Sequence, residues 1–223
     1  MSLPVIVIGF GGHGQVVAAA LQAAGQTVQA ATDLDPARLV SKHSNLEIIT
    51  DEELLKRYPP ERVRLVSGIG SIWPTSASSA RVLSIEKFKA LGYRFTGVRH
   101  PFTWIAPSAD LAGTSQIHAG AVVQPGAVVG SFSIINSRAS VDHDCYLESM
   151  CHIGPGVTLS GNVKVGAGSH LGTGSTVVQG VTLGKHCFVA AGATVVRDVA
   201  DGEYVRGVPA VAFDPRPRRS DLR

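Results

Sequence analysis

The chain has few cysteines, little net charge and no long hydrophobic run, and each shortage excludes a class of protein. Three cysteines among 223 residues are an odd and small number, which argues against a disulfide-stapled secreted domain. A net charge of +3 is too small to indicate a nucleic-acid partner. No apolar stretch approaches the roughly 20 residues of a membrane-spanning helix. The first apolar run also lacks the basic segment that precedes the apolar region of a signal peptide. We therefore expect a cytoplasmic protein that binds neither nucleic acid nor a membrane.

The first hundred residues alternate short apolar runs with helical patterns. The expected strands are residues 3–9, 27–33 and 62–70, and the expected helices are 13–25 and 51–59, with a last helix and strand in 84–98. Asp51 is the expected cap of the second helix, and Pro59 its stop. This rhythm is typical of parallel βαβ units with right-handed crossovers. It predicts an α/β Rossmann-like domain over residues 1–100.

A glycine-rich loop follows the first expected strand. Gly9, Gly11 and Gly14 spell G-x-G-x-x-G, and Asp33 stands nineteen residues after the last of them. In such loops unhindered backbone N–H groups approach a pyrophosphate at a helix N-terminus. NAD and nucleotide sugars both carry a pyrophosphate, but about a hundred residues offer only half of a doubly wound sheet, without a second domain for hydride transfer. The size of the domain therefore argues against an NAD enzyme, and the loop alone does not identify the ligand that carries the pyrophosphate.

Several residues around this loop are candidates for ligand contact. Those expected from the pattern are Gly9, Gly11, Gly12, Gly14, Asp33, Asp35 and Gly70. Asp33 and Asp35 stand at the end of a strand, from which side chains reach a ribose or a base. N-capping of a helix before Pro36 explains the same two residues equally well. Both interpretations stay open.

From Ile105 onward the chain repeats every six residues. Sixteen consecutive hexads begin with Ile, Leu or Val, and their fifth residue is always Ala, Ser, Cys or Val. A period of six excludes an amphipathic α-helix. It fits a β-solenoid in which three hexads make one coil, the first residue points inward, and stacked coils lie about 4.8 Å apart. Residues 101–223, with the C-terminal tail, form the second expected domain.

All three cysteines occupy the small fifth position of a hexad. Cys151 and Cys187 share a column but lie two coils apart, which is about 9.6 Å and beyond disulfide reach. Together with Cys145, they are expected to be small core residues.

The unbroken repeat resembles that of the hexapeptide-repeat acyltransferases, which are left-handed parallel β-helices and usually trimers. The GFGGHG loop at residues 9–14 and VDHDC at residues 141–145 narrow the resemblance to the sialic acid O-acetyltransferase-like group. Its best understood members N-acetylate nucleotide-linked 4-amino-4,6-dideoxy sugars for bacterial glycans and O-antigens. The resemblance implies an N-terminal domain that holds the nucleotide of the acceptor, with acetyl-CoA bound along the solenoid. It also implies a homotrimer with active sites between subunits, no metal, and contact of His13 with the acceptor.

The chemistry is expected at VDHDC. His143 is the third residue of its hexad, near a corner and facing outward, and Asp144 follows it. Gly161 comes one coil later, eighteen residues on, so its backbone N–H is expected close to His143. Acyl transfer to an amine needs a proton acceptor and donors for the developing oxyanion. Register and resemblance both assign His143 as the base and the Gly161 N–H as the oxyanion donor.

Two features of this assignment stay open. Neighbouring residues on a strand point to opposite faces, so contact between His143 and Asp144 requires a corner geometry. A sugar amine that binds neutral can also attack without a base, and His143 would then position the acceptor. The resemblance further places Asn136 and His152 near the acceptor and the acetyl group, with His152 and Gly161 as acetyl-CoA contacts. A polar column of the solenoid explains Asn136 equally well.

The sequence therefore predicts an acetyl-CoA-dependent N-acetyltransferase that acts on GDP-perosamine or a UDP-linked 4-amino sugar. Transfer to a sugar hydroxyl is the alternative within the same class. His152 is expected to stack over His170, which raises a zinc enzyme like the γ-type carbonic anhydrases as a rival, but no convincing third ligand is present. A non-enzymatic scaffold is the remaining alternative, and the His–Asp pair in VDHDC argues against it.

Overall fold

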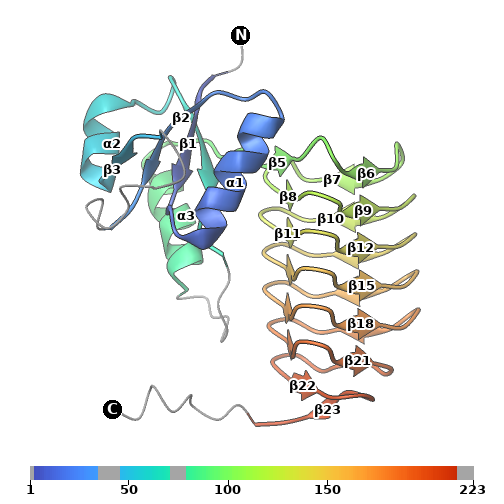
Figure 1. The fold of residues 1–223 in the computed structure, drawn as a ribbon. Coiled ribbons are helices and arrows are strands. Elements are labelled where there is room, and N and C mark those ends of the chain that lie inside the picture. Colours follow the sequence, from blue (N-terminus) through green and yellow to red (C-terminus); the bar gives the residue numbers. More distant parts are fainter. Residues whose placement is uncertain (1–2, 35–45, 71–78, 215–223) are drawn as a thin grey trace.

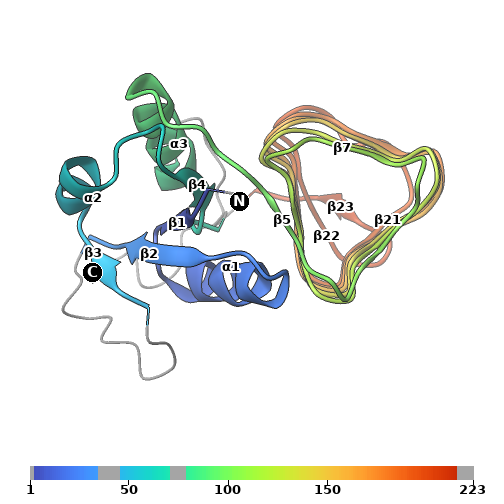
Figure 2. The same ribbon diagram turned by 90° about the horizontal axis from the view of Figure 1, so that it is seen from above.

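The structure is a computed structural model that describes residues 3–34, 46–70 and 79–214. An α/β unit lies beside a triangular column of stacked coils (Figure 1, Figure 2). In these residues no helix is both long and apolar enough to cross a lipid bilayer. Asp35, one of the expected ligand contacts, lies outside the described residues.

The α/β unit is built on a four-stranded parallel sheet with strand order β3-β2-β1-β4. Its elements are β1 (Val5–Ile8), α1 (Gly12–Ala23), β2 (Val28–Thr32), β3 (Ile48–Ile49), α2 (Asp51–Arg57), β4 (Arg64–Ser67) and α3 (Ala80–Ala90). Successive residues of β1 point to opposite faces, and both faces are buried. Val5 and Val7 pack in the cluster that includes α1, whereas Ile6 and Ile8 pack in the cluster with Leu54 of α2. The sheet therefore has a hydrophobic core on each side, as a Rossmann-like unit requires.

The local details of this unit differ from the expectation in two places. Thr50, and not Asp51, caps α2, because its hydroxyl accepts from Glu53 N and the Glu53 carboxylate accepts from Thr50 N. This reciprocal pair is a capping box, which satisfies two helix-end donors at once. The two-residue strand β3 was not expected, because it is too short to show a period.

The last expected strand of the α/β pattern does not join the α/β sheet. Between α3 and Gly97, only Phe95 makes a single bridge, to Leu65 of β4. Val98, the end of the expected strand, instead belongs to β5 (Val98–Arg99), which pairs in parallel with β8 (Gln116–Ile117) of the coiled column. The chain thus passes from one sheet to the other within a few residues, and this connection holds the two parts side by side.

The column is a left-handed parallel β-helix with three sheets. The sheet that turns toward the α/β unit, here called the near face, contains β5 (Val98–Arg99), β8 (Gln116–Ile117), β11 (Ile134–Ile135), β14 (His152–Ile153), β17 (His170–Leu171), β20 (Phe188–Val189), β22 (Tyr204–Arg206) and β23 (Val211–Ala212). The second sheet contains β6 (Trp104–Ile105), β9 (Val122–Val123), β12 (Ser140–Val141), β15 (Thr158–Leu159), β18 (Thr176–Val177) and β21 (Thr194–Val195). The third contains β7 (Asp110–Leu111), β10 (Val128–Val129), β13 (Tyr146–Leu147), β16 (Lys164–Val165) and β19 (Thr182–Leu183).

Paired residues of neighbouring coils are eighteen positions apart, as three hexads per coil require. His152 pairs with His170, Thr158 with Thr176, and Lys164 with Thr182. Aliphatic residues at the first hexad position fill the interior. The cysteines are buried and free, as expected, and burial raises the pKa of Cys151 to about 12. Its thiol is therefore an inert core group.

Candidate active site

The glycine loop connects β1 to α1, and within it the backbone of Gly14 packs closely against the carbonyl of Gly9. A Cβ on Gly14 would lie 2.1 Å from the carbonyl oxygen of Gly9, so only glycine fits there. Helix α1 begins at Gly12, with Gly11 as an N-cap that offers no side-chain hydrogen bond, and its first turn has no acidic residue. The N–H groups of this turn and the helix dipole are therefore available to an anion.

Replacing Gly14 with alanine is expected to lower the free energy of unfolding by about 1–3 kcal/mol, because the methyl group overlaps backbone that cannot retreat. Gly113→Ala is the matched control, since a Cβ there meets no atom within 4 Å. Thermal unfolding of the two variants measures the difference. Equal midpoints would show that the loop moves to accommodate the methyl group.

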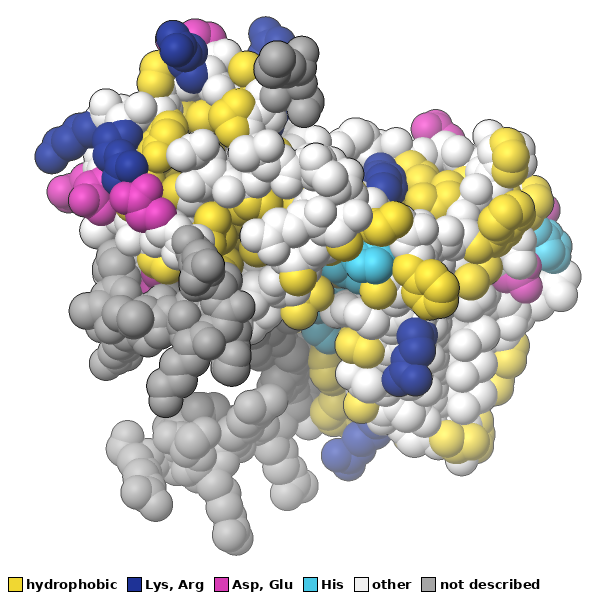
Figure 3. Space-filling model, turned by 45° about the horizontal axis from the view of Figure 1, so that its top comes forward, with side chains coloured by type: hydrophobic (Ala, Val, Ile, Leu, Met, Phe, Trp, Pro, Cys, Tyr) yellow, Lys and Arg dark blue, Asp and Glu magenta, His cyan; other side chains and the backbone are white. Residues whose placement is uncertain are grey.

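A cavity of about 960 Å³ opens in front of this loop, between the α/β unit and the near face. Its lining comes from the loop, the ends of β2 and β4, and the solenoid corner after β11 and β14, and includes Gly9, Gly11, Gly12, His13, Asp33, Gly68, Gly70, Asn136, Ser137, His152 and Pro155. Histidine side chains are visible in the crevice between the two parts (Figure 3). A volume of this size accommodates a nucleotide sugar. The structure thus brings the expected loop residues together with Asn136 and His152.

Asp33 contributes to the shape of the loop. Its Oδ2 accepts a hydrogen bond from the backbone N–H of Phe10 at 3.3 Å. The residue also lines the cavity, so it supports the loop and faces the ligand space. Its expected contact with a ribose or base stays a prediction, and the alternative helix before Pro36 lies outside the described residues.

Four histidines lie together where the loop meets the near face. The ring centroids of His13 and His118 are 5.4 Å apart, those of His13 and His152 are 6.4 Å apart, and those of His152 and His170 are 4.6 Å apart. Burial lowers the pKa of His13 to about 4, of His118 to about 3 and of His170 to about 4, and lowers the pKa of His152 well below its ordinary value. These imidazoles are therefore neutral at neutral pH. His13 and His152 each lie within hydrogen-bond distance of a neighbouring amide, Gln116 and Asn136, and His118 contributes packing, since neither of its ring nitrogens has a partner in the described residues.

The histidine cluster gives no support to the zinc alternative. In the described part of the chain, no three side chains of His, Cys, Asp or Glu converge in a way that would hold a metal ion. Asn136 Nδ2 instead lies 3.4 Å from His152 Nε2. Sequence reasoning missed His118 and Gln116 in this region. Gln116 stands in the same column as His152, two coils away, but nothing in the repeat shows which column meets the α/β unit.

His143, Asp144 and Gly161 form a second cluster. Nδ1 of His143 donates to Oδ2 of Asp144 at 2.8 Å, and Asp144 has a φ of 57°. This left-handed conformation turns the chain at the corner and brings two successive side chains to the same side. Nε2 of His143 faces Gly161, where a Cβ would lie only 2.4 Å from it.

The charge state of His143 differs from that of the buried histidines. Its side chain is 52% exposed. The hydrogen bond to Asp144 raises the pKa of His143 above its ordinary value of 6.5. With Nδ1 donating to the carboxylate, the neutral ring presents the lone pair of Nε2 to solvent. This arrangement suits a general base.

The two clusters lie at different corners of the prism. His143 stands between β12 and β13, at the corner between the second and third sheets, here called the remote corner. This corner points away from the α/β unit, whereas the near face turns toward it (Figure 2). Within one chain, the structure therefore does not bring His143, Asp144 and Gly161 together with the cavity.

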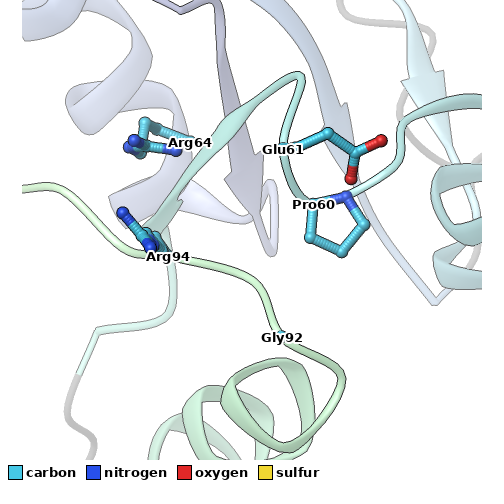
Figure 4. Close-up of a pocket in the computed structure, with 5 residues that line it drawn as sticks. All are labelled: Pro60, Glu61, Arg64, Gly92 and Arg94. Carbon is cyan, nitrogen blue, oxygen red and sulfur yellow. The ribbon is translucent and has the colours of Figure 1, made fainter.

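A second, smaller cavity of about 390 Å³ lies at the other end of the α/β sheet. It is lined by Pro60, Glu61, Arg64, Gly92 and Arg94 (Figure 4). Arg64 begins β4, whereas Ser67 at the opposite end of the strand is followed by Gly68 and Gly70, which line the larger cavity beside the glycine loop. Ligands of parallel α/β sheets bind at the carboxyl ends of the strands. This smaller cavity is therefore not the candidate active site.

The fold is that of a hexapeptide-repeat acetyltransferase with an N-terminal α/β unit. Residues 4–74 match the family model of the PglD N-terminal domain, and no curated protein matches the chain. The chain is 34% identical to the acetyltransferase domain of PglB from Neisseria gonorrhoeae, solved in complex with acetyl coenzyme A, with a TM-score of 0.85 and coverage of 96% of this chain and 100% of that chain.

A second similar structure is PerB from Caulobacter crescentus, in complex with CoA and GDP-perosamine. It is 35% identical, with a TM-score of 0.84 and coverage of 96% of this chain and 100% of that chain. WeeI from Acinetobacter baumannii has a TM-score of 0.79 at 20% identity, over 95% of this chain and 100% of that chain, which concerns the fold alone. The protein belongs to the family of the PglB acetyltransferase domain and the perosamine N-acetyltransferases, as the sequence predicts.

Proposed function

We propose that the protein transfers the acetyl group of acetyl-CoA to the 4-amino group of a nucleotide-linked 4-amino-4,6-dideoxy sugar. GDP-perosamine and a UDP-linked 4-amino sugar are the proposed acceptors, for bacterial glycan, O-antigen or lipopolysaccharide biosynthesis. The observation that carries the proposal is the His143–Asp144 pair, poised over Gly161 at an exposed corner. The relatives bound to acetyl-CoA, or to CoA and GDP-perosamine, support it. The proposed division assigns the nucleotide sugar to residues 1–100 and acetyl-CoA and catalysis to residues 101–223.

The proposed reaction follows from the geometry of the corner. The amine nitrogen attacks the thioester carbonyl to form a tetrahedral intermediate, and Nε2 of His143 accepts the amine proton. The C–S bond then breaks as the carbonyl re-forms, and the imidazolium of His143 returns the proton to the sulfur, so CoA leaves as the thiol. The N–H of Gly161 makes no hydrogen bond to any described residue. It is thus available to the oxyanion of the tetrahedral intermediate. Asp144 holds the ring in the tautomer that leaves Nε2 unprotonated.

A homotrimer is part of the proposal, because the cavity and His143 lie at different corners of one prism. A complete site then combines the cavity of one subunit with the remote corner of another. The outward side chains of the second sheet support such packing, since its strand column runs through Val122, Ser140, Thr158, Thr176 and Thr194. These small and β-branched residues, with the exposed Trp104 at the head of the same column, make a surface that a second copy can cover.

Acetyl-CoA turnover, followed by thiol release, tests the function. The acceptor panel contains UDP-, GDP- and dTDP-linked 4-amino sugars and their hydroxy counterparts. NADH consumption is measured separately as a control for NAD-dependent activity. Thiol release with one 4-amino sugar supports the proposal and identifies which nucleotide, UDP, GDP or dTDP, the acceptor carries. Activity on a hydroxy sugar alone would make the protein an O-acetyltransferase, and no turnover at all would favour a scaffold.

Asp144→Asn is expected to shift the pH profile of kcat/KM to lower pH. In the unmodified enzyme His143 must be deprotonated to act, so the rate rises as pH increases through a pKa above 6.5. Removing the carboxylate removes the main cause of the raised pKa, so the inflection moves down, and the weaker base lowers the plateau rate about tenfold. Rates measured across this pH range test the shift. An unchanged inflection would assign the titration to the sugar amine.

A further inference from the structure

Gln116 connects the near face to the glycine loop. It lies in β8, at the interface between the two parts of the molecule, and is only 2% exposed. Its Nε2 donates to the carbonyl oxygen of Ser67 at 2.7 Å, and its Oε1 lies 3.0 Å from Nε2 of His13. Ser67 ends β4 and His13 lies in the first turn of α1. One buried amide therefore touches both elements that shape the nucleotide cavity.

The polarity of these bonds determines where His13 carries its proton. The carbonyl of Ser67 can only accept, so the amide nitrogen of Gln116 must face it, and the amide oxygen must face His13. An amide oxygen also only accepts, so Nε2 of His13 is the donor. Burial holds the pKa of His13 at about 4, and a neutral imidazole carries only one ring proton. Nδ1 is therefore left as a hydrogen-bond acceptor.

The surroundings of His13 keep it in this neutral form. The titratable groups that face it are His118 and His152 of the solenoid, and Arg81 of α3 acts on it through its charge. Both histidines are neutral and Arg81 is a cation, so none of these described neighbours is an acid that would stabilise an imidazolium. The side chain of His13 also lines the cavity, where its acceptor nitrogen is available to a ligand.

We infer that Gln116 is a positioning residue, which locks His13 in the Nε2–H tautomer so that Nδ1 accepts a hydrogen bond from a hydroxyl or amino group of the bound nucleotide sugar. This inference rests on the proposed function for the nature of the ligand. The tautomer itself does not depend on that function. Gln116 acts through His13, so it affects binding of the nucleotide sugar and leaves the chemistry at His143 unchanged.

Kinetics of Gln116→Met test the effect on binding. Methionine keeps the approximate volume but removes both hydrogen bonds, so KM for the nucleotide sugar is expected to rise about tenfold. KM for acetyl-CoA and kcat should stay within about twofold, because the remote corner is untouched. The matched control is Gln29→Met on the exposed part of β2, which should change none of these values. A change in kcat or in KM for acetyl-CoA, with no change for the nucleotide sugar, would overturn the inference.

A double-mutant cycle separates positioning from simple packing. Asparagine in place of His13 can present an amide oxygen near the position of Nδ1, but it cannot reach Gln116. In the His13→Asn background, Gln116→Met should therefore have no further effect on KM for the nucleotide sugar. If the two effects multiply instead, Gln116 acts independently of His13 and the inference is wrong.

Nitrogen-15 chemical shifts of the imidazoles test the tautomer without any turnover. The signal that disappears in His13→Asn is assigned to His13, and we expect it to show protonated Nε2 and unprotonated Nδ1. Gln116→Met should broaden or shift this signal toward a mixture of tautomers. An Nδ1–H tautomer in the unmodified protein overturns the inference. Absence of acetyl transfer with every acceptor would instead overturn the proposed function.

Discussion

His143→Ala is expected to lower kcat/KM by about 10²–10⁴-fold, the range for loss of a positioned general base. The expected effect falls on kcat, because the cavity proposed for the nucleotide sugar lies at another corner of the prism, so KM for the nucleotide sugar should change little. The side chain is half exposed and contacts mainly Asp144, so its removal should leave folding unaffected. Thiol release under saturating acetyl-CoA measures the loss.

His186→Ala is the matched control for this prediction. His186 is also an exposed histidine at a solenoid corner, with a φ of 55°, but no carboxylate pairs with it among the described residues. Its removal should leave kcat/KM within about twofold. A loss below tenfold in His143→Ala would mean that the amine attacks as the neutral species, with His143 positioning the acceptor. Transfer to a sugar hydroxyl would depend more strongly on the base than transfer to an amine.

The solenoid could be predicted from the sequence in detail because three six-residue repeats make one coil, so the register follows from residue number. Eighteen residues return the chain to the same place one coil later, so the position of Gly161 beside His143 and the burial of the cysteines follow from counting. The contact between His143 and Asp144 did not follow, because it depends on a positive φ at a residue that is not glycine. Such a conformation is uncommon and is set by the corner as a whole.

The interface between the two parts could not be predicted from the repeat. All three faces of the prism have aliphatic residues inside and both polar and apolar residues outside, such as Ile134, Val122 and Val128, and no spacing shows which face meets the α/β unit. The bond between His13 and Gln116 joins residues 103 positions apart, and Arg81 of α3 donates to the carbonyl of Phe132 at a solenoid corner. Such tertiary contacts follow from how two surfaces fit. Once the near face is known, however, the column of Gln116, His152 and His170 is determined by register.

A mixture of two inactive variants is expected to recover activity if each site combines two subunits. His143→Ala removes the base, and Gly12→Asp places a carboxylate at the N-terminus of α1, where it repels a pyrophosphate. A Cβ on Gly12 meets no atom within 4 Å, and a carboxylate at a helix N-terminus interacts favourably with the helix dipole. The variant should therefore fold. Each variant alone should be nearly inactive.

If the protein is the proposed trimer, coexpression of the two variants in equal amounts produces mixed trimers. A site is complete when a subunit with an intact cavity faces a subunit with an intact His143, which holds for about a quarter of the sites in a cyclic trimer. Activity is therefore expected to reach about a quarter of that of the unmodified enzyme. The negative control is His143→Ala with Gly161→Val, because both changes affect the same remote corner and should not complement.

The outcome shows whether the site is formed within one chain or is shared between two subunits. If His143 served the cavity of its own chain, no subunit in the mixture would hold both intact parts, and activity would stay at the level of the single variants. The geometry of one prism argues against that result, because the near face carries Asn136 and His152 while His143 stands at the remote corner. Recovery would also require the copies to pack side by side, since two corners of different chains must approach closely enough for an amine on one subunit to reach the base of another. Complementation therefore tests the trimer and the shared site in the same measurement.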